Sequence, residues 1–199
     1  MTISSIDRIV KKGIKSLKTS LWEYWPAAGQ NEIAERNVSI HIAHQFIQSR
    51  WRVSAEASFP YKANRRVDLL AIQIGRKAFV VGESKLLHDS TKAGSLAKDG
   101  NRIMNFRLSD EHGWRPPISQ RFGLLLALTW NPEVAKWWRT HPTHPPFPKQ
   151  SSGNGWKSLG KFLNSRKATC RASLLYSYPG GNKKRDEHWV VYAIFKLPK

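Results

Sequence analysis

Residues 65–87, RRVDLLAIQIGRKAFVVGESKLL, hold two apolar runs around a short polar interruption, and this segment constrains the fold more than any other. Gly75-Arg76 is a natural two-residue turn, so the runs are predicted to form an antiparallel β-hairpin centred on it. With that centre Leu70 faces Val81, and the residues of both runs are apolar on both faces. Strands of this kind lie in the middle of a sheet that helices cover on both sides. The hairpin therefore predicts an α/β fold.

Helical and extended patterns alternate along the rest of the chain. Apolar residues at helical spacing predict a helix over residues 1–20, with lysines on its opposite face, and a second, clearer helix over 31–49 that Asn31 can cap. Further helices are predicted over 92–108 and 131–140, strands over 51–60, 121–130, 171–178 and 187–197, and a loop over 140–158. The basic face of the first helix could meet phosphates or a membrane surface, although a packing helix with a solvated basic face is preferred.

We expect one domain in three parts. Residues 1–30 form a basic helical segment, residues 31–130 form the core, and residues 131–199 form a basic extension that ends in a β-hairpin. The single cysteine, Cys170, excludes an internal disulfide and suits a reducing compartment. No stretch approaches the roughly 18–20 apolar residues of a membrane span, and the N-terminus lacks the apolar core of a secretory signal. A cytoplasmic protein is expected.

Charge is the strongest signal in the composition. The 33 lysines and arginines outnumber the 14 acidic residues and give a net charge of +19. Between Glu133 and Asp186 the chain has no acidic residue at all. Such a one-signed field attracts polyanions, whereas a merely solubilising surface mixes both signs. Nucleic acid is therefore the expected partner, with an acidic membrane surface as a minor competitor.

Three charged residues interrupt the apolar hairpin at one end. Asp68 lies opposite Glu83 in the predicted pairing, and Lys85 follows on the same face as Glu83, while Ser84 points to the other face and is expected to be merely small. Two opposed carboxylates repel each other unless a divalent cation lies between them. Mg²⁺, with Mn²⁺ as a substitute, prefers carboxylate, phosphate and water oxygens, and Lys85 would lie beside a metal-bound water or a scissile phosphate. The alternative is a surface ion pair at a strand end.

Four segments in this order, ERNVSIHIAHQFI, VSAEASFP, RRVDLLAI and VVGESK, resemble the PD-(D/E)XK nuclease superfamily, which has the restriction-endonuclease-like fold. The resemblance covers residues 31–130. It implies an α/β/α sandwich around a central mixed sheet, and Mg²⁺-dependent cleavage of nucleic acid with Asp68, Glu83 and Lys85 as the catalytic core. The proline of the superfamily's name is absent before Asp68, where Arg66 and Val67 stand.

A helix glutamate belongs to the same superfamily pattern. Glu35 matches it better than Glu32, which lies one turn earlier and remains an alternative; either could contact the metal directly or through water. Both could instead merely favour the positive end of the helix dipole. Glu56, near the end of the first predicted strand, is a further possible contributor.

The resulting hypothesis is a metal-dependent nuclease, most simply a DNA endonuclease, that acts as a homodimer if both strands are cut. The residues expected to grip backbone phosphates are Arg65, Arg66, Lys157, Lys161, Arg166, Lys167, Lys183, Lys184 and Arg185. Among nine tryptophans, Trp137 or Trp156 is expected to be accessible for stacking on bases. The alternatives are a non-catalytic nucleic-acid-binding module on the same fold and a basic structural protein.

Overall fold

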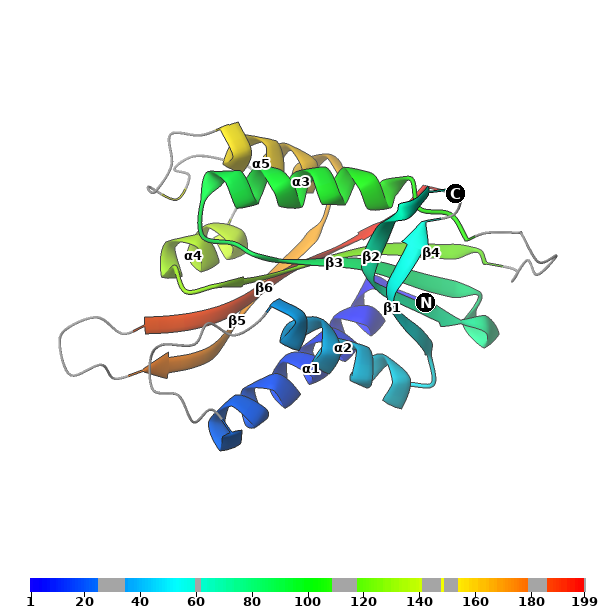
Figure 1. Ribbon diagram of the computed structural model, residues 1–199, viewed down its shortest axis with the longest axis horizontal. Helices are drawn as coiled ribbons and strands as arrows, with labels where there is room; N and C mark the ends of the chain where they lie inside the picture. The colour runs from blue at the N-terminus through cyan, green and yellow to red at the C-terminus, as the bar shows by residue number, and fades with distance from the viewer. Residues whose placement is uncertain are drawn as a thin grey trace.

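A six-stranded mixed sheet separates two layers of helices, as seen in Figure 1. The computed structural model describes residues 1–24, 35–59, 62–108, 118–140, 148, 154–178 and 186–198, with the backbone alone at 59, 62–65, 177, 178 and 186. Its elements are α1 (Ile3–Tyr24), α2 (Glu35–Gln48), β1 (Arg52–Phe59), β2 (Lys62–Gln73), the 3₁₀ turn η1 (Ile74–Arg76), β3 (Ala78–Leu86), α3 (Ser90–Met104), β4 (Gln120–Thr129), α4 (Pro132–Thr140), α5 (Asn154–Ser165), β5 (Thr169–Tyr178) and β6 (Asp186–Lys196). The expected α/β sandwich with a mixed sheet is confirmed.

The strands lie in the order β1-β2-β3-β4-β6-β5. Only β3 and β4 pair in parallel, and α3 makes the crossover between them. All other neighbours are antiparallel, including β6 with both β4 and β5. The C-terminal hairpin therefore completes the same sheet as the predicted core, and β3 and β4 are its central strands.

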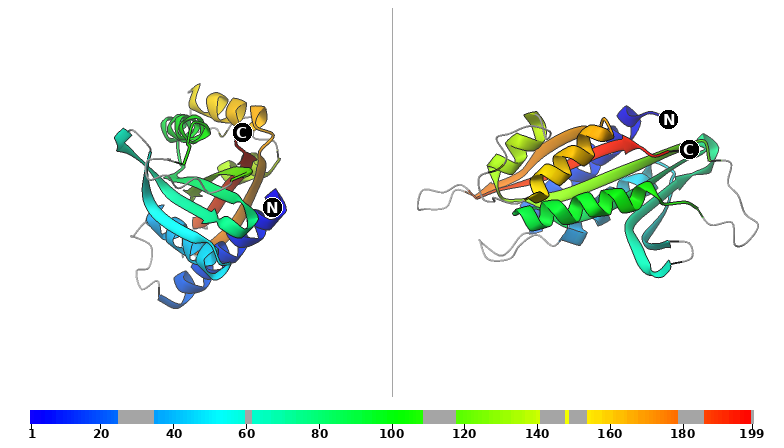
Figure 2. Two further views of the ribbon diagram at one scale, coloured as in Figure 1. Left: turned by 90° about the vertical axis from the view of Figure 1, so that its right-hand side faces the viewer. Right: turned by 90° about the horizontal axis from the view of Figure 1, so that it is seen from above.

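Each face of the sheet has its own apolar core. On one side α1 and α2 pack on the sheet through residues such as Ile6, Ile14 and Ile42. On the other side α3, α4 and α5 bury residues such as Leu96 and Trp138. Figure 2 shows α3 and α5 lying side by side over the sheet. The double covering explains why the central strands are apolar on both faces.

α1 runs unbroken through Gly13, which sequence propensity disfavours. The glycine lies against α2, where an added Cβ would be only 2.8 Å from the Cα of Ile42. A tyrosine hydroxyl from the last strand, that of Tyr192, also donates a 2.7 Å hydrogen bond to Asp7 of α1. Tertiary contact, rather than local preference, holds this helix.

The β2–β3 hairpin has the predicted register with a different turn. Leu70 pairs with Val81 as expected, but the last pair is Gln73 with Ala78. The connection is therefore four residues long, and Lys77 takes the left-handed conformation (φ 50°) that a two-residue turn would have required of its central residues. The prediction of a two-residue Gly75-Arg76 turn was wrong, although its centre was right.

Helix α5 was missed, since residues 140–158 were predicted to be a loop and no helix was predicted after them. Its glycines, asparagines and serines are weak helix formers. Trp156, Leu159 and Leu163 nevertheless lie at helical spacing and are buried. An added Cβ on Gly155 would be 1.8 Å from the carbonyl oxygen of Ser90, so packing against α3 selects both the helix and its glycine.

Candidate active site

The candidate site lies where β2 leaves β3. Their backbone pairing ends at Leu69 and Gly82, whereas β3 continues to Leu86 along β4. Val67 packs in the core beneath α3, but Leu69, two residues later, packs in the core beneath α1 and α2. Strand alternation therefore breaks at Asp68, and on the neighbouring strand β1 Glu56 has a positive φ of 50°. Among the described residues, this bend leaves one edge of β3 without a backbone partner from residue 84 onward.

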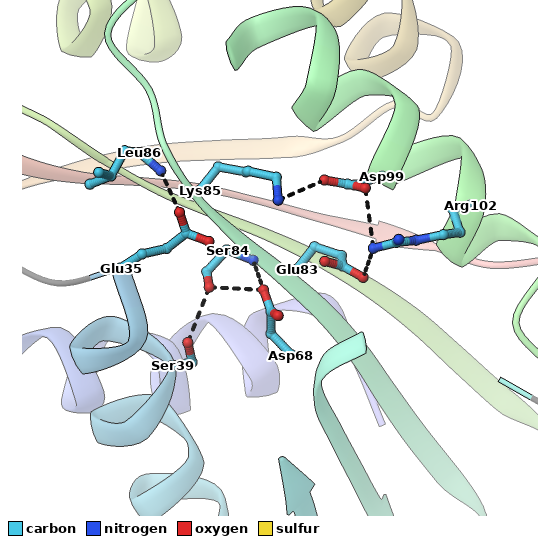
Figure 3. Close-up of polar contacts among 9 residues, drawn as sticks. All are labelled: Glu35, Ser39, Asp68, Glu83, Ser84, Lys85, Leu86, Asp99 and Arg102. Carbon is cyan, nitrogen blue, oxygen red and sulfur yellow. Dashed lines mark hydrogen bonds and ion pairs between the residues drawn. The ribbon is translucent and has the colours of Figure 1, made fainter. Parts of the chain in front are cut away.

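Two carboxylates take the place of the departed strand. Oδ2 of Asp68 accepts hydrogen bonds from the backbone amide of Ser84 at 2.7 Å and from its hydroxyl at 2.9 Å. Oε2 of Glu35, at the start of α2, accepts one from the backbone amide of Leu86 at 3.0 Å. The Ser84 hydroxyl also lies 3.1 Å from that of Ser39 on α2 (Figure 3). The carboxylates thus satisfy amides that would otherwise lack a protein acceptor.

Glu83 and Lys85 point to the other side of β3, toward α3 (Figure 3). Nη2 of Arg102 lies 2.5 Å from Oε1 of Glu83 and 3.1 Å from Oδ1 of Asp99. Nζ of Lys85 lies 3.3 Å from Oδ2 of Asp99. The four side chains form one chain of alternating charge, in which Asp99 joins the two cations.

Burial makes this cluster electrostatically unusual. Glu83 is only 2% exposed. Burial above all, then the field of Asp68, raises its pKa to about 8, and Arg102 only partly offsets them. The pKa of Glu35 is also raised, again mainly by burial, with Asp68 contributing. Burial alone would lower the pKa of Lys85, but Asp99, Glu35 and Glu83 raise it above its ordinary value, so Lys85 stays charged.

The donor set suits a hard divalent cation. Each of the three carboxylates keeps one oxygen, Oδ1 of Asp68, Oε2 of Glu83 and Oε1 of Glu35, that accepts no hydrogen bond from the described residues. No three acidic, histidine or cysteine side chains within the described ranges are grouped closely enough to hold a metal by themselves. Mg²⁺ commonly binds only one or two carboxylates and completes its shell with water and substrate phosphates, so these oxygens are the ligands that such an ion could use here.

The structure brings Glu35, Asp68, Glu83 and Lys85 into one region, but not in the expected ladder pair. The pairing stops one position short, so Asp68 does not face Glu83 across the strands and is held by Ser84. The expectation that Ser84 is merely small was therefore wrong.

Glu56 does not join the cluster. Its carboxylate pairs with Arg66 at 3.1 Å and Arg36 at 3.3 Å on the exposed side of β1. Glu32, the alternative to Glu35, lies outside the described residues.

The predicted phosphate contacts are dispersed. Arg66, Lys157, Lys161, Arg166 and Lys167 are exposed, the last four in and just after α5. The side chain of Arg65 and the residues Lys183, Lys184 and Arg185 lie outside what the structure describes. Trp137 and Trp156 are 5% and 1% exposed, so the prediction that one of them is accessible was wrong.

Sequence reasoning missed Ser39, Asp99 and Arg102. Asp99 and Arg102 are three residues apart on a predicted helix, a spacing that places them on one face. That spacing was a usable signal that the two act together. The rotation of the helix, which aims them at Glu83 and Lys85, depends on packing that a single sequence does not display.

Comparisons with protein-family models, with curated proteins and with solved structures gave no match. Among the described helices, none combines the length and the apolar character that crossing a bilayer would require.

Proposed function

We propose that this protein is a metal-dependent nuclease that hydrolyses phosphodiester bonds, acting on DNA as an endonuclease. The observation that carries the proposal is the cluster at the β2–β3 divergence, where burial and then the field of Asp68 raise the pKa of Glu83 and Lys85 remains a cation beside them. Mutually unfavourable carboxylates next to a fixed ammonium are what metal-assisted attack on a phosphate requires. The resemblance to the PD-(D/E)XK superfamily and the net charge of +19 point the same way.

In this proposal Asp68 and Glu83 hold Mg²⁺, and Glu35 assists them. When bound, the ion would polarise the phosphate and lower the pKa of a water molecule. Asp99 fixes the ammonium of Lys85, whose charge orients the attacking water and stabilises the extra negative charge on the phosphate. Arg66 and the exposed cations of α5 hold the backbone of the nucleic acid. A cytoplasmic protein that dimerises to cut both strands is part of the same proposal.

One observation favours a second candidate, a non-catalytic nucleic-acid-binding module. Asp68 and Glu35 hydrogen-bond to the open edge of β3, and Glu83 pairs with Arg102, so every acidic residue of the cluster already has a part in the fold. Under this reading the protein binds nucleic acid without cleaving it and has no use for Mg²⁺.

Replacing Asp68 by Asn separates the two readings. The amide oxygen of Asn can still accept the hydrogen bonds from Ser84, so the fold should persist while the negative charge is lost. We expect Asp68→Asn to lower Mg²⁺-dependent cleavage by at least about a hundredfold and to leave nucleic-acid binding unchanged or tighter. The measurement is cleavage of duplex, branched and single-stranded DNA and RNA with Mg²⁺, Mn²⁺ or EDTA.

The matched control is Glu23→Gln, which removes one exposed carboxylate at the end of α1. It should cleave like the wild type. Wild-type protein that cuts no substrate and shows no Mn²⁺ binding by calorimetry would leave the binding module as the correct function. Normal cleavage by Asp68→Asn would refute the site.

A further inference from the structure

We propose that the exposed face of α1 is a second nucleic-acid-binding surface, on the opposite side of the sheet from the basic residues of α5. This α1 ridge consists of Arg8, Lys11, Lys12, Lys15 and Lys18. The inference rests on the proposed function only for the kind of partner, which is nucleic acid. It does not require that the protein cleaves this partner.

Helical geometry puts all five cations on one side of α1. At about 100° per residue they fall within an arc of roughly 120°. The opposite side is apolar, and Ile6, Val10, Ile14 and Leu17 are buried there against the sheet and α2. From Arg8 to Lys18 the ridge spans about 15 Å, long enough to meet several consecutive phosphates.

Little negative charge offsets the ridge. Asp7 pairs with Lys11 at 2.7 Å and also accepts the hydroxyl of Tyr192. Arg8, Lys12, Lys15 and Lys18 form no ion pair with the described residues. Within the part of the chain that the structure describes, these four cations thus have no ion-pair partner that competes with an external anion.

An exposed aromatic side chain extends the same arc. Trp22 is 79% exposed, more than any other large apolar side chain among those described. Its ring lies 6.3 Å from that of Tyr176 on β5, at an angle of 57°. A cationic ridge that ends in an exposed aromatic ring matches single-stranded nucleic acid, whose phosphates and bases can be engaged together.

The buried face of α1 argues against a membrane. A helix that binds a bilayer inserts its apolar face between the lipids. In α1 that face is buried in the protein core. The helix lies so close to α2 that a Cβ added to Gly13 would be 2.8 Å from the Cα of Ile42. The exposed side of α1 offers a partner five cations, one indole and, at the end of the helix, the single carboxylate of Glu23, a balance that fits a polyanion.

The test neutralises three unpaired lysines together, Lys12→Gln, Lys15→Gln and Lys18→Gln, because Gln keeps helix propensity. A control triple variant, Lys98→Gln, Lys136→Gln and Lys196→Gln, removes the same charge from exposed positions on α3, α4 and β6. Binding of fluorescent duplex and single-stranded DNA is measured by anisotropy at about 0.05–0.3 M KCl. EDTA is present so that no cleavage contributes.

We expect the ridge variant to lower the slope of log K against log salt by about 2–3, since each lost phosphate contact accounts for about 0.7–0.9. The control variant should change the slope by less than about 1. Equal changes in the two variants, or an unchanged slope in the ridge variant, would overturn the proposal. So would a ridge variant that keeps DNA binding but loses binding to vesicles rich in phosphatidylserine.

Trp22 gives an independent readout. Trp22→Ala should weaken single-stranded DNA binding about fivefold or more while leaving the salt slope unchanged, because stacking does not release counterions. Trp22→Phe should retain most of the affinity. Wild-type protein that cleaves no substrate, but whose salt slope falls in the ridge variant, would contradict the nuclease and leave the ridge proposal standing.

Discussion

Glu83 is a carboxylic acid whose ionised form the fold does not favour. It is almost fully buried, it lies in the field of Asp68, and it forms an ion pair with Arg102. With a pKa of about 8 it carries a proton in much of the folded protein at neutral pH. A residue in this position responds strongly to any added positive charge, whether a proton or a divalent cation.

The raised pKa of Glu83 predicts a loss of stability as the pH rises. In the unfolded chain the group ionises near its ordinary value of 4.5, but in the folded protein it ionises only near 8. Between these values the folded state binds more protons, so stability falls with rising pH. Glu83→Gln cannot ionise, and its Tm relative to the wild type should therefore rise by about 5–10 °C between pH 5 and pH 9 in EDTA.

Thermal melts at pH 5, 7 and 9 check this prediction, with the exposed Glu23→Gln as the control that should follow the wild type. Mg²⁺ added at pH 9 should restore the wild type and have no effect on Glu83→Gln, since the cation replaces the missing proton. If the Tm of Glu83→Gln and the Tm of the wild type changed with pH by the same amount, Glu83 would ionise normally in the folded protein.

At the scale of elements, α3 supplies the counter-charges of the site. Arg102 and Asp99 reach it from one face of the helix, and Asp99 also fixes Lys85. The helix that connects β3 to β4 therefore sets the electrostatic environment of Glu83 and Lys85 on β3.

Removing Arg102 should have an effect that depends on pH. Arg102→Gln leaves the buried Glu83 without its cation, so stability should fall by about 1–3 kcal/mol at pH 9, where Glu83 is ionised. Near pH 6 Glu83 is protonated and the loss should be smaller. Urea unfolding at both pH values measures the difference, with Lys98→Gln on the exposed side of α3 as the control. A loss that is the same at both pH values would mean that Arg102 acts through packing alone.

Strand alternation and turn position made the hairpin predictable from sequence. They gave the register of β2 and β3 and the shared face of Glu83 and Lys85. They did not give the bend at Asp68, where the neighbouring strand is also irregular because Glu56 has a positive φ.

Helices were harder to predict from the sequence than strands. The helical spacing in α1 was visible, but the face of α3 that carries Asp99 and Arg102 is set by contacts with distant segments. Half of helix α5 is glycine, asparagine and serine, which are weak helix formers, and the helix is stabilised by burial of Trp156 against α3 and the sheet. For the same reason Trp156 is unavailable for stacking, whereas Trp22 is exposed.

At the scale of the whole molecule, the net charge of +19 works against compactness. Dissolved salt screens this repulsion over distances longer than about 10 Å. We therefore expect the Tm to rise by about 2–5 °C between low salt and about 0.3 M KCl. Differential scanning fluorimetry measures the shift, and tetramethylammonium chloride should reproduce it if screening is the cause. A Tm that falls with salt would show that local ion pairs outweigh the general repulsion.

α1 packs against β5 and β6, which come much later in the sequence, and Asp7 accepts a hydrogen bond from Tyr192, 185 residues further along. During translation the first helix leaves the ribosome long before its supporting strands exist. Its apolar side must then stay soluble until β5 and β6 have been made, and the lysines on its opposite side help to keep it so.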